Sequence, residues 1–241
     1  RLRGRTIQAT KRRGKFLWLV LDDEQAVVVH LGMSGQVLIQ EPTAPFEKHL
    51  RIRWTFTDDG RALHFVDQRT FGGMQVEELR PDQDVVEEWV PHSVMHIARD
   101  PLDEAFSLQR VQEKMAAKHS AVKRVILDQT VLSGVGNIYA DEALWRSKLH
   151  WATPALALTG QQVAELVSHV QDVMVEALAQ GGTSFDSLYV NVNGESGYFA
   201  RGLNAYGRED EPCYRCGTLI VRDAFMNRSS FRCPTCQPPA R

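Results

Sequence analysis

Residues 213–236 read CYRCGTLIVRDAFMNRSSFRCPTC, a stretch that begins and ends with a Cys-x2-Cys pair. Each pair offers two sulfurs from one tight turn, and two such turns supply the four thiolates of a tetrahedral zinc site. We therefore expect Cys213, Cys216, Cys233 and Cys236 to bind one structural Zn²⁺ ion, with two disulfides or free thiols as the alternatives. A four-cysteine site has no open position, so this metal would hold the fold and take no part in catalysis.

The residues between the two pairs predict a β-hairpin. Leu219-Ile220-Val221 and Ser229-Ser230-Phe231-Arg232 alternate with the period of strands. Arginines occur along this hairpin at Arg222, Arg228 and Arg232. A zinc-held hairpin that carries arginines is typical of nucleic-acid-binding proteins.

Upstream of this finger the apolar period is that of helices, which we predict over residues 108–115, 122–129, 141–149 and 159–180. Thr159 is the expected N-cap of the last helix, and Gly181-Gly182 its end. Between two of the helices lies Ser133-Gly134-Val135-Gly136-Asn137. The two glycines would let backbone amides and the Asn137 side chain approach a phosphate, although a plain helix–helix turn explains the same residues.

The N-terminal part predicts antiparallel sheet in a sandwich or barrel. Apolar runs at 16–21 and 27–31 flank an acidic turn, and alternating runs at 51–57 and 62–66 flank a second one. Residues 77–104 are acidic and contain three prolines, so we expect a linker there with at most a short helix.

Charge is distributed unevenly along the 241 residues, although the net charge is only -2. Residues 1–15 contain seven basic side chains and no acidic one, which fits a polyanionic partner or a solvated strand end. No apolar run approaches the ~20 residues of a membrane helix. We therefore expect a soluble cytoplasmic protein with no membrane partner.

Six motifs together resemble one known family, the bacterial formamidopyrimidine-DNA glycosylases. They occur in the family's order from about residue 6 to the end of the chain. Besides the four-cysteine finger they are His30-Leu31-Gly32-Met33-Ser34-Gly35, Asp67-Gln68-Arg69-Thr70-Phe71-Gly72, Ser133-Gly134-Val135-Gly136-Asn137-Ile138-Tyr139-Ala140-Asp141-Glu142, Gly181-Gly182-Thr183-Ser184 and Tyr206-Gly207-Arg208.

The resemblance implies an α+β multidomain fold. Residues 1–104 would form an antiparallel β-sandwich domain, incomplete at its start, with the acidic linker. Residues 105–205 would form a helix-two-turn-helix DNA-binding domain with a lesion-capping loop at 189–199, and residues 206–241 the zinc finger with its β-hairpin.

The implied activity is base-excision repair by a bifunctional DNA glycosylase and abasic-site lyase. Such an enzyme flips 8-oxoguanine or a formamidopyrimidine out of duplex DNA, forms an imine and cuts the strand by β,δ-elimination. The implied partner is double-stranded DNA with oxidised purines or abasic sites. We expect a monomer associated with the bacterial nucleoid.

Residue roles carry over from the family by position. Met33, Arg69 and Phe71 match the residues that fill the space left by the flipped base, although Met33 and Phe71 alone would suit an ordinary core. The positions that match phosphate-binding residues are Lys15, His49, Lys118, Asn137 and Arg228. Of these, Lys15 also matches a lysine that assists β-elimination, and Arg228 an arginine implicated in δ-elimination.

The match breaks at the amino terminus. In the family an N-terminal proline attacks the sugar and a following glutamate moves protons, whereas this sequence opens Arg1-Leu2-Arg3-Gly4. We therefore expect an N-terminally truncated chain that binds DNA but does not excise a base.

Three alternatives to this function stay open at the level of sequence. An endonuclease VIII-like enzyme would act on oxidised pyrimidines. A damage-binding protein would have kept the fold and lost the nucleophile. A zinc-ribbon transcription or RNA-binding protein would need neither Met33 nor Arg69-Thr70-Phe71.

Overall fold

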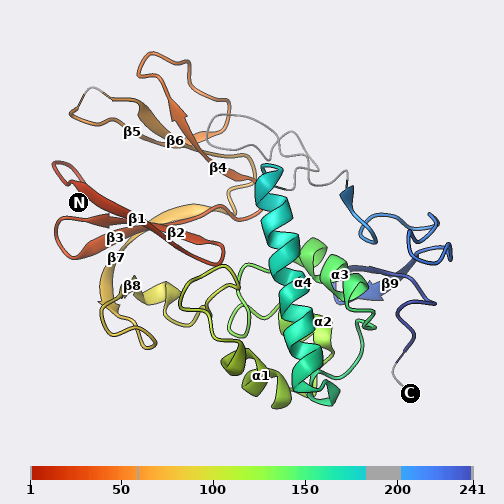
Figure 1. The fold of residues 1–241 in the computed structure, drawn as a ribbon. Helices are drawn as coiled ribbons and strands as arrows, with labels where there is room; N and C mark the ends of the chain where they lie inside the picture. Colours follow the sequence, from red (N-terminus) through yellow and green to blue (C-terminus); the bar gives the residue numbers. More distant parts are fainter. Residues whose placement is uncertain (1, 59, 183–201, 240–241) are drawn as a thin grey trace. The chain divides into compact units, whose positions relative to one another are not determined.

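A computed structural model describes residues 2–58, 60–182 and 202–239. The chain forms two compact units (Figure 1). The first contains the residues up to Met95, and the second contains His96–Leu178 and the described C-terminal residues. Each unit is considered by itself below.

The first unit is built from two antiparallel sheets. A five-stranded sheet has the order β1-β2-β3-β7-β8, and its strands are Ile7–Arg13, Phe16–Leu21, Gln25–His30, Gly73–Pro81 and Trp89–Pro91 in that order. A three-stranded sheet has the order β4-β6-β5, and its strands are Gly35–Gln40, Ala62–Asp67 and Leu50–Trp54. A short 3-10 helix, His92–Val94, follows β8.

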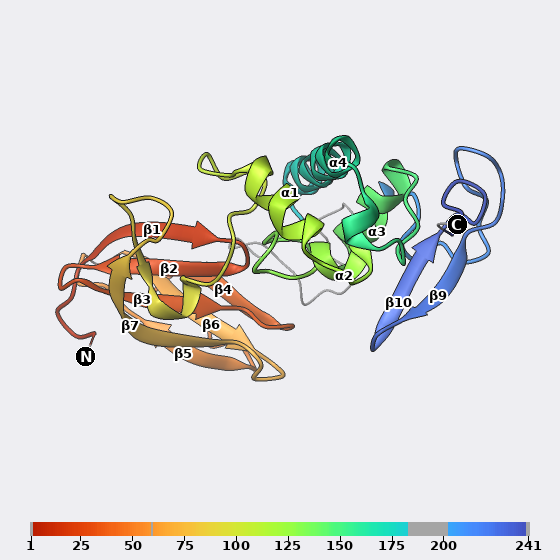
Figure 2. The same ribbon diagram turned by 90° about the horizontal axis from the view of Figure 1, so that it is seen from below.

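Apolar side chains from both sheets share one core, so the predicted sandwich is confirmed. Leu19 and Val27 from the five-stranded sheet pack with Leu63 of β6, and partly buried residues of β4 and β5 complete the layer. The two expected hairpins pair as predicted, β2 with β3 and β5 with β6. Figure 1 shows the two sheets as separate layers, and in Figure 2 one sheet overlies the other.

The acidic segment 77–104 differs from the expected linker in its first part. Glu77–Pro81 belong to β7, and Trp89–Pro91 form β8 beside it. The reason lies in the alternation of Met74 and Val76, which are half buried on either side of an exposed residue and pack on the core of the sandwich. High acidic content obscured this strand pattern.

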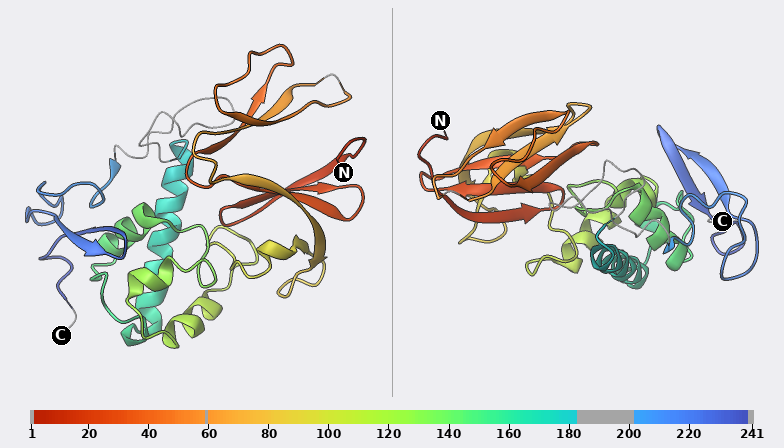
Figure 3. Two further views of the ribbon diagram at one scale, coloured as in Figure 1. Left: turned by 180° about the vertical axis from the view of Figure 1, so that it is seen from behind. Right: turned by 90° about the horizontal axis from the view of Figure 1, so that it is seen from above.

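The second unit contains four α-helices in its described residues. They are α1 Leu108–Ala116, α2 Val122–Ile126, α3 Asn137–Arg146 and α4 Gly160–Ala179, with a 3-10 helix at Ala155–Ala157. Residues from all four helices form one buried cluster. The left view in Figure 3 shows α4, in teal, beside the shorter helices.

Capping residues explain where two of these helices begin. Ser107 accepts a hydrogen bond from the Arg110 N–H at the start of α1. At α4 the Thr159 hydroxyl accepts from the Gln162 N–H while the Gln162 side chain accepts from the Thr159 N–H, which is a capping box. The predicted N-cap at Thr159 is therefore confirmed.

The C-terminal residues form a two-stranded antiparallel hairpin, β9 Val221–Phe225 and β10 Arg228–Arg232. Its tip is tight, because Met226 adopts a φ of 51°. In the part of the chain that the structure describes, no helix combines the length and apolar character that a membrane span needs.

Candidate metal centre and nucleic-acid interface

The four cysteines lie together at the base of the β9–β10 hairpin, with all four sulfurs within 4.8 Å of one another. Cys216 Sγ is 3.4 Å from Cys233 Sγ and 3.5 Å from Cys236 Sγ. A disulfide bond needs about 2.05 Å, whereas sulfurs bound at about 2.3 Å from a tetrahedral zinc ion lie about 3.8 Å apart. The donor set therefore fits one structural Zn²⁺ ion, and the disulfide alternative is wrong for these distances.

Local backbone bonds shape each turn around the sulfurs. The Gly217 N–H donates to the Cys213 carbonyl, and Gly217 adopts a φ of 76° that a side chain would oppose. In the second turn the Gln237 N–H donates to the Cys233 carbonyl. Burial raises the pKa of the Cys233 thiol to about 12. A bound zinc ion would counter that cost by holding the thiolate form.

Three polar contacts near the metal site tie the finger to the end of α3 and to the residues that follow it. The Trp145 indole N–H donates to Cys213 Sγ at 3.4 Å. The Arg215 guanidinium donates to the Trp145 carbonyl and stacks on the Trp145 ring, 4.1 Å from its centroid. The Gln237 side chain donates to the Leu149 carbonyl at 2.9 Å. Trp145, near the end of α3, therefore contacts the metal site directly.

A buried ion pair fixes the other side of the hairpin. Lys123 Nζ of α2 lies 2.6 Å from Asp141 Oδ1 of α3, and both side chains are at most 1% exposed. Asp141 also accepts from the Ser230 hydroxyl and the Phe231 N–H of β10. Burial lowers the pKa of Lys123 and raises the pKa of Asp141, and their attraction opposes both shifts. The ion pair therefore joins two helices and the hairpin at one point.

Two predicted phosphate-binding residues meet at this junction. Asn137, the first residue of α3, donates from Nδ2 to the Ser229 carbonyl at 3.0 Å, and Lys123 Nζ donates to the same carbonyl. Arg228 is the neighbour of Ser229 and is exposed at the hairpin tip. The structure therefore brings Asn137 and Arg228 together, although they are far apart in sequence.

The turn between α2 and α3 is held by the side chain of Gln129. Its amide donates to the carbonyls of Leu127 and Val135 and accepts from the Gly134 N–H. Gly134 adopts a φ of 82°, which explains the need for glycine there. Helix α3 then begins at Asn137, four positions before the predicted start, because Gly136 supplies its extended N-cap.

Lys118 lies in the loop after α1, where its ammonium is 3.6 Å from the Asp128 carboxylate. Both side chains are more than one third exposed. Within the described residues, Lys118 forms no hydrogen bond or ion pair with Asn137 or Arg228. Its role in phosphate binding stays a prediction.

In the first unit, Met33 and Phe71 occupy two facing loops. Their side chains are 54% and 61% exposed, so the reading of both as core residues is wrong. Arg69 is also exposed and lies in the same loop as Phe71. Glycine allows the two loops to approach each other closely. A Cβ atom on Gly32 would lie only 2.6 Å from the Phe71 carbonyl carbon, so a larger residue would clash there.

Lys15 and His49 lie at other places in this unit. Lys15 occupies the turn between β1 and β2, directly after Gly14 with its φ of 55°. That turn follows Arg13, whose guanidinium forms a buried ion pair with Asp82. His49 is half buried before β5, and its carbonyl accepts the Asp67 N–H.

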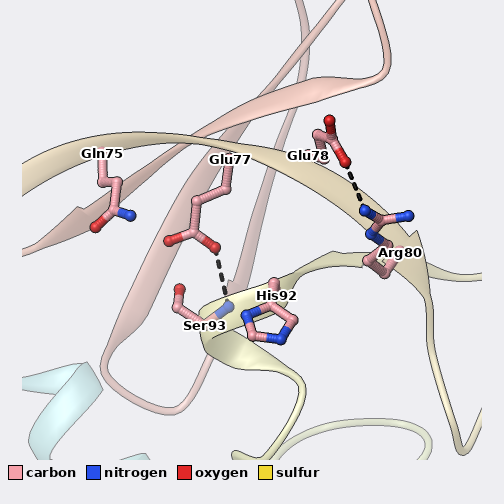
Figure 4. A pocket seen from close by; sticks show the side chains of 6 residues that line it. All are labelled: Gln75, Glu77, Glu78, Arg80, His92 and Ser93. Atoms are coloured by element: carbon pink, nitrogen blue, oxygen red, sulfur yellow. Dashed lines mark hydrogen bonds and ion pairs between the residues drawn. The ribbon is translucent and has the colours of Figure 1, made fainter.

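The predicted loop 189–199 lies outside the described residues. A hollow lined by polar residues occurs elsewhere, between β7 and the 3-10 helix at His92–Val94 (Figure 4). Its acids are already engaged, since Glu77 accepts from the Ser93 N–H and Glu78 pairs with Arg80. It contains none of the residues that the sequence singled out.

Several residues that organise these sites were missed at the level of sequence. Glu142 is buried and accepts four hydrogen bonds from residues 204–206, which fixes the chain where it enters the finger. Lys123 and Asp67 are further examples. In the sequence, the burial of these acids was indicated only by their position inside an otherwise apolar or glycine-rich motif, as at Asp141-Glu142 and Asp67.

The fold and these sites define a DNA-binding protein that combines a β-sandwich, a helix-two-turn-helix unit and a zinc finger. Family models match residues 1–74 as "Formamidopyrimidine-DNA glycosylase N-terminal domain", 97–188 as the H2TH domain of the same enzymes, and 210–239 as "Zinc finger found in FPG and IleRS". The chain belongs to the formamidopyrimidine-DNA glycosylase family, a family of DNA-repair glycosylases. The resemblance drawn from the motifs is thereby confirmed.

Individual relatives agree with this assignment. Formamidopyrimidine-DNA glycosylase of Rhodococcus jostii is 60% identical over 241 residues, which cover 100% of this chain and 81% of that protein. The enzyme of Salinispora arenicola is 58% identical, over 99% of this chain and 80% of that protein.

Solved structures of relatives show the same fold. MutM (Fpg) from Thermus thermophilus superposes with a TM-score of 0.83 at 32% identity, covering 99% of this chain and 85% of that one. Lactococcus lactis Fpg in complex with DNA containing an abasic site gives 0.80 at 28% identity, covering 98% and 83%.

Replacing Lys123 with methionine should destabilise the second unit by about 3 kcal/mol, because Asp141 would remain buried without its cation. The double variant Lys123→Met/Asp141→Asn should recover part of that loss. Denaturant unfolding followed by tryptophan fluorescence measures both, with exposed Lys148→Met as a control expected to change stability by less than about 0.5 kcal/mol. A double variant less stable than the single one would show that charge burial is not the cause.

Removing zinc should unfold the finger and abolish DNA binding, because the hairpin that carries Arg228 depends on the metal. A chelator titration monitored by near-ultraviolet circular dichroism and by electrophoretic mobility of a DNA duplex tests this. Adding zinc back should restore both signals. Unchanged DNA affinity in the metal-free protein would refute the structural role of the ion.

Proposed function

We propose that this protein recognises oxidised purines in duplex DNA and acts in their base-excision repair. The observation that carries the proposal is the exposure of Met33 and Phe71 on two loops held in contact. Apolar side chains of this size are normally buried, and exposed wedges of this kind separate stacked bases. Arg69 beside them has the donors to bond the base left without its partner.

The second unit supports the same function through phosphate contacts. Arg228 is exposed and Asn137 opens helix α3, so both offer donors to the DNA backbone. We infer that Lys118 and His49 contribute further contacts. Lys15 of the first unit would both bind phosphate and assist β-elimination. Arg228 of the second unit would assist δ-elimination.

The excision step needs an amine that is unprotonated near neutral pH. An α-amino group titrates near ~8, whereas a lysine titrates near ~10.4, so a terminal amine is the better nucleophile for imine formation. We infer that excision by this protein uses a terminal amine as the nucleophile.

The substrate class and setting follow from the same reasoning. The names of the relatives favour oxidised purines over the oxidised pyrimidines of endonuclease VIII-like enzymes. A damage-binding protein without chemistry is the second candidate, since lesion recognition and excision rest on different residues. We expect the protein to act as a monomer on the chromosomal DNA of a bacterium.

Three alanine variants should separate backbone binding from lesion recognition. Arg228→Ala and Asn137→Ala should weaken binding to damaged and undamaged duplexes alike by about tenfold, because phosphates carry no sequence or lesion information. Phe71→Ala should weaken binding mainly to the damaged duplex. Fluorescence anisotropy at several salt concentrations measures these affinities, and equal losses of Phe71→Ala on both duplexes would contradict the division.

Borohydride trapping on an 8-oxoguanine duplex tests the chemistry. The protein purified from its native source should form a covalent adduct on this duplex, because excision by a terminal amine passes through an imine. Binding without an adduct would favour the damage-binding alternative.

A further inference from the structure

Asp67, the last residue of β6, lies where the loops of Met33 and Phe71 meet. Its carboxylate is fully buried and accepts three hydrogen bonds from these loops. The Ser34 hydroxyl donates to Oδ1 at 2.5 Å, the Arg69 N–H donates to Oδ1 at 3.2 Å, and the Gly72 N–H donates to Oδ2 at 2.8 Å. One side chain therefore binds the two loops at once.

The backbone of Asp67 adds a third segment to this junction. Its N–H donates to the His49 carbonyl at 3.0 Å, and its carbonyl accepts from Arg51 Nε at 2.9 Å. His49 is one of the predicted phosphate-binding residues. Asp67 thus contacts every segment of the first unit that carries a predicted DNA-binding residue, apart from the turn of Lys15.

The loop that follows Asp67 is strained. Thr70 adopts a φ of 56°, a conformation that a β-branched residue rarely takes and that persists only when the surroundings impose it. The bonds from the neighbouring Arg69 and Gly72 N–H groups to Asp67 supply this constraint on both sides of Thr70. Phe71 directly follows the strained residue, so its direction depends on the same bonds.

We propose that Asp67 is a positioning residue that holds Met33, Arg69 and Phe71 as one preformed wedge. The inference rests on the proposed function, because it assigns to Asp67 the placement of the lesion-recognising side chains. A preformed wedge avoids the entropy cost of ordering two loops when DNA binds. Asp67 itself is buried and would not touch DNA.

The chemistry of the junction requires a carboxylate. Burial alone would raise the pKa of Asp67, but the bonds from Ser34, Gly72, Arg69 and Thr70 outweigh burial and lower it. The group is therefore ionised at neutral pH and accepts on both oxygens. Asparagine has the same shape but only one acceptor oxygen, so its amide N–H₂ would face a donor in one of the two loops.

The test compares Asp67→Asn with Asp58→Asn, which makes the same change at an exposed turn residue of the same unit. Affinity is measured by anisotropy for a duplex with a tetrahydrofuran abasic analogue and for the matched undamaged duplex. A 2-aminopurine placed opposite the analogue reports insertion of the wedge through its fluorescence. Asp67→Asn should lower the preference for the damaged duplex about tenfold and remove the 2-aminopurine response, with undamaged binding changed less than about twofold.

A double-mutant cycle with Phe71→Ala separates positioning from general destabilisation. If Asp67 acts through the wedge, Asp67→Asn should cost little further discrimination once Phe71 is gone. Independent, multiplying losses would overturn the proposal, as would Asp67→Asn with unchanged discrimination. If the unsubstituted protein binds both duplexes equally well, that result contradicts the proposed function itself rather than the role of Asp67. Asp58→Asn should behave like the unsubstituted protein, and an equal loss there would attribute the effect to charge alone.

Discussion

The buried contact between Lys123 and Asp141 is the constraint on which the DNA-binding half of the molecule depends. Two charges in a fully covered position are stable only while they remain paired and their remaining bonding capacity is used. Here the spare capacity is taken up by the Ser229 carbonyl, the Ser230 hydroxyl and the Phe231 N–H. The side chains of Lys123 and Asp141 therefore also fix the position of the hairpin that carries Arg228 against α3. Zinc acts at the opposite end of the hairpin, so the two fixed points together define its orientation on α3.

The first unit uses a similar device with different chemistry. Asp67 is a buried carboxylate with no ion pair among the described residues, and hydrogen bonds from two backbone amides and one hydroxyl stabilise its charge. Glu142 in the second unit follows the same rule, with three backbone amides and the Asn204 side chain as donors. In each case a buried acid fixes a neighbouring loop through hydrogen bonds with the backbone amides of that loop. Rigid loops keep exposed apolar side chains such as Met33 and Phe71 in a fixed orientation.

Sequence reasoning was strongest where one residue type implies one chemistry. The cysteine spacing predicted the metal centre, β-branched runs predicted the sandwich strands, and Thr159 predicted the start of α4. It failed for β7 and β8, because Glu77, Glu78 and the prolines obscured a strand that packs on the core through Met74 and Val76. It also missed the roles of Lys123, Asp67 and Glu142. A charged residue gives no local sign of being buried, since burial depends on partners that lie tens of residues away in the chain.

That separation in sequence bears on how the molecule is made. Asn137 and Lys123 find their shared acceptor at Ser229, 92 and 106 residues further along. During synthesis the helices emerge well before the finger, so α2 and α3 must first exist with their buried charges only partly satisfied. Completion of the chain then supplies the hairpin that covers them. Until the last thirty or so residues have been made, the helical unit lacks the hairpin that carries Arg228, and we expect it to be less stable than in the finished chain.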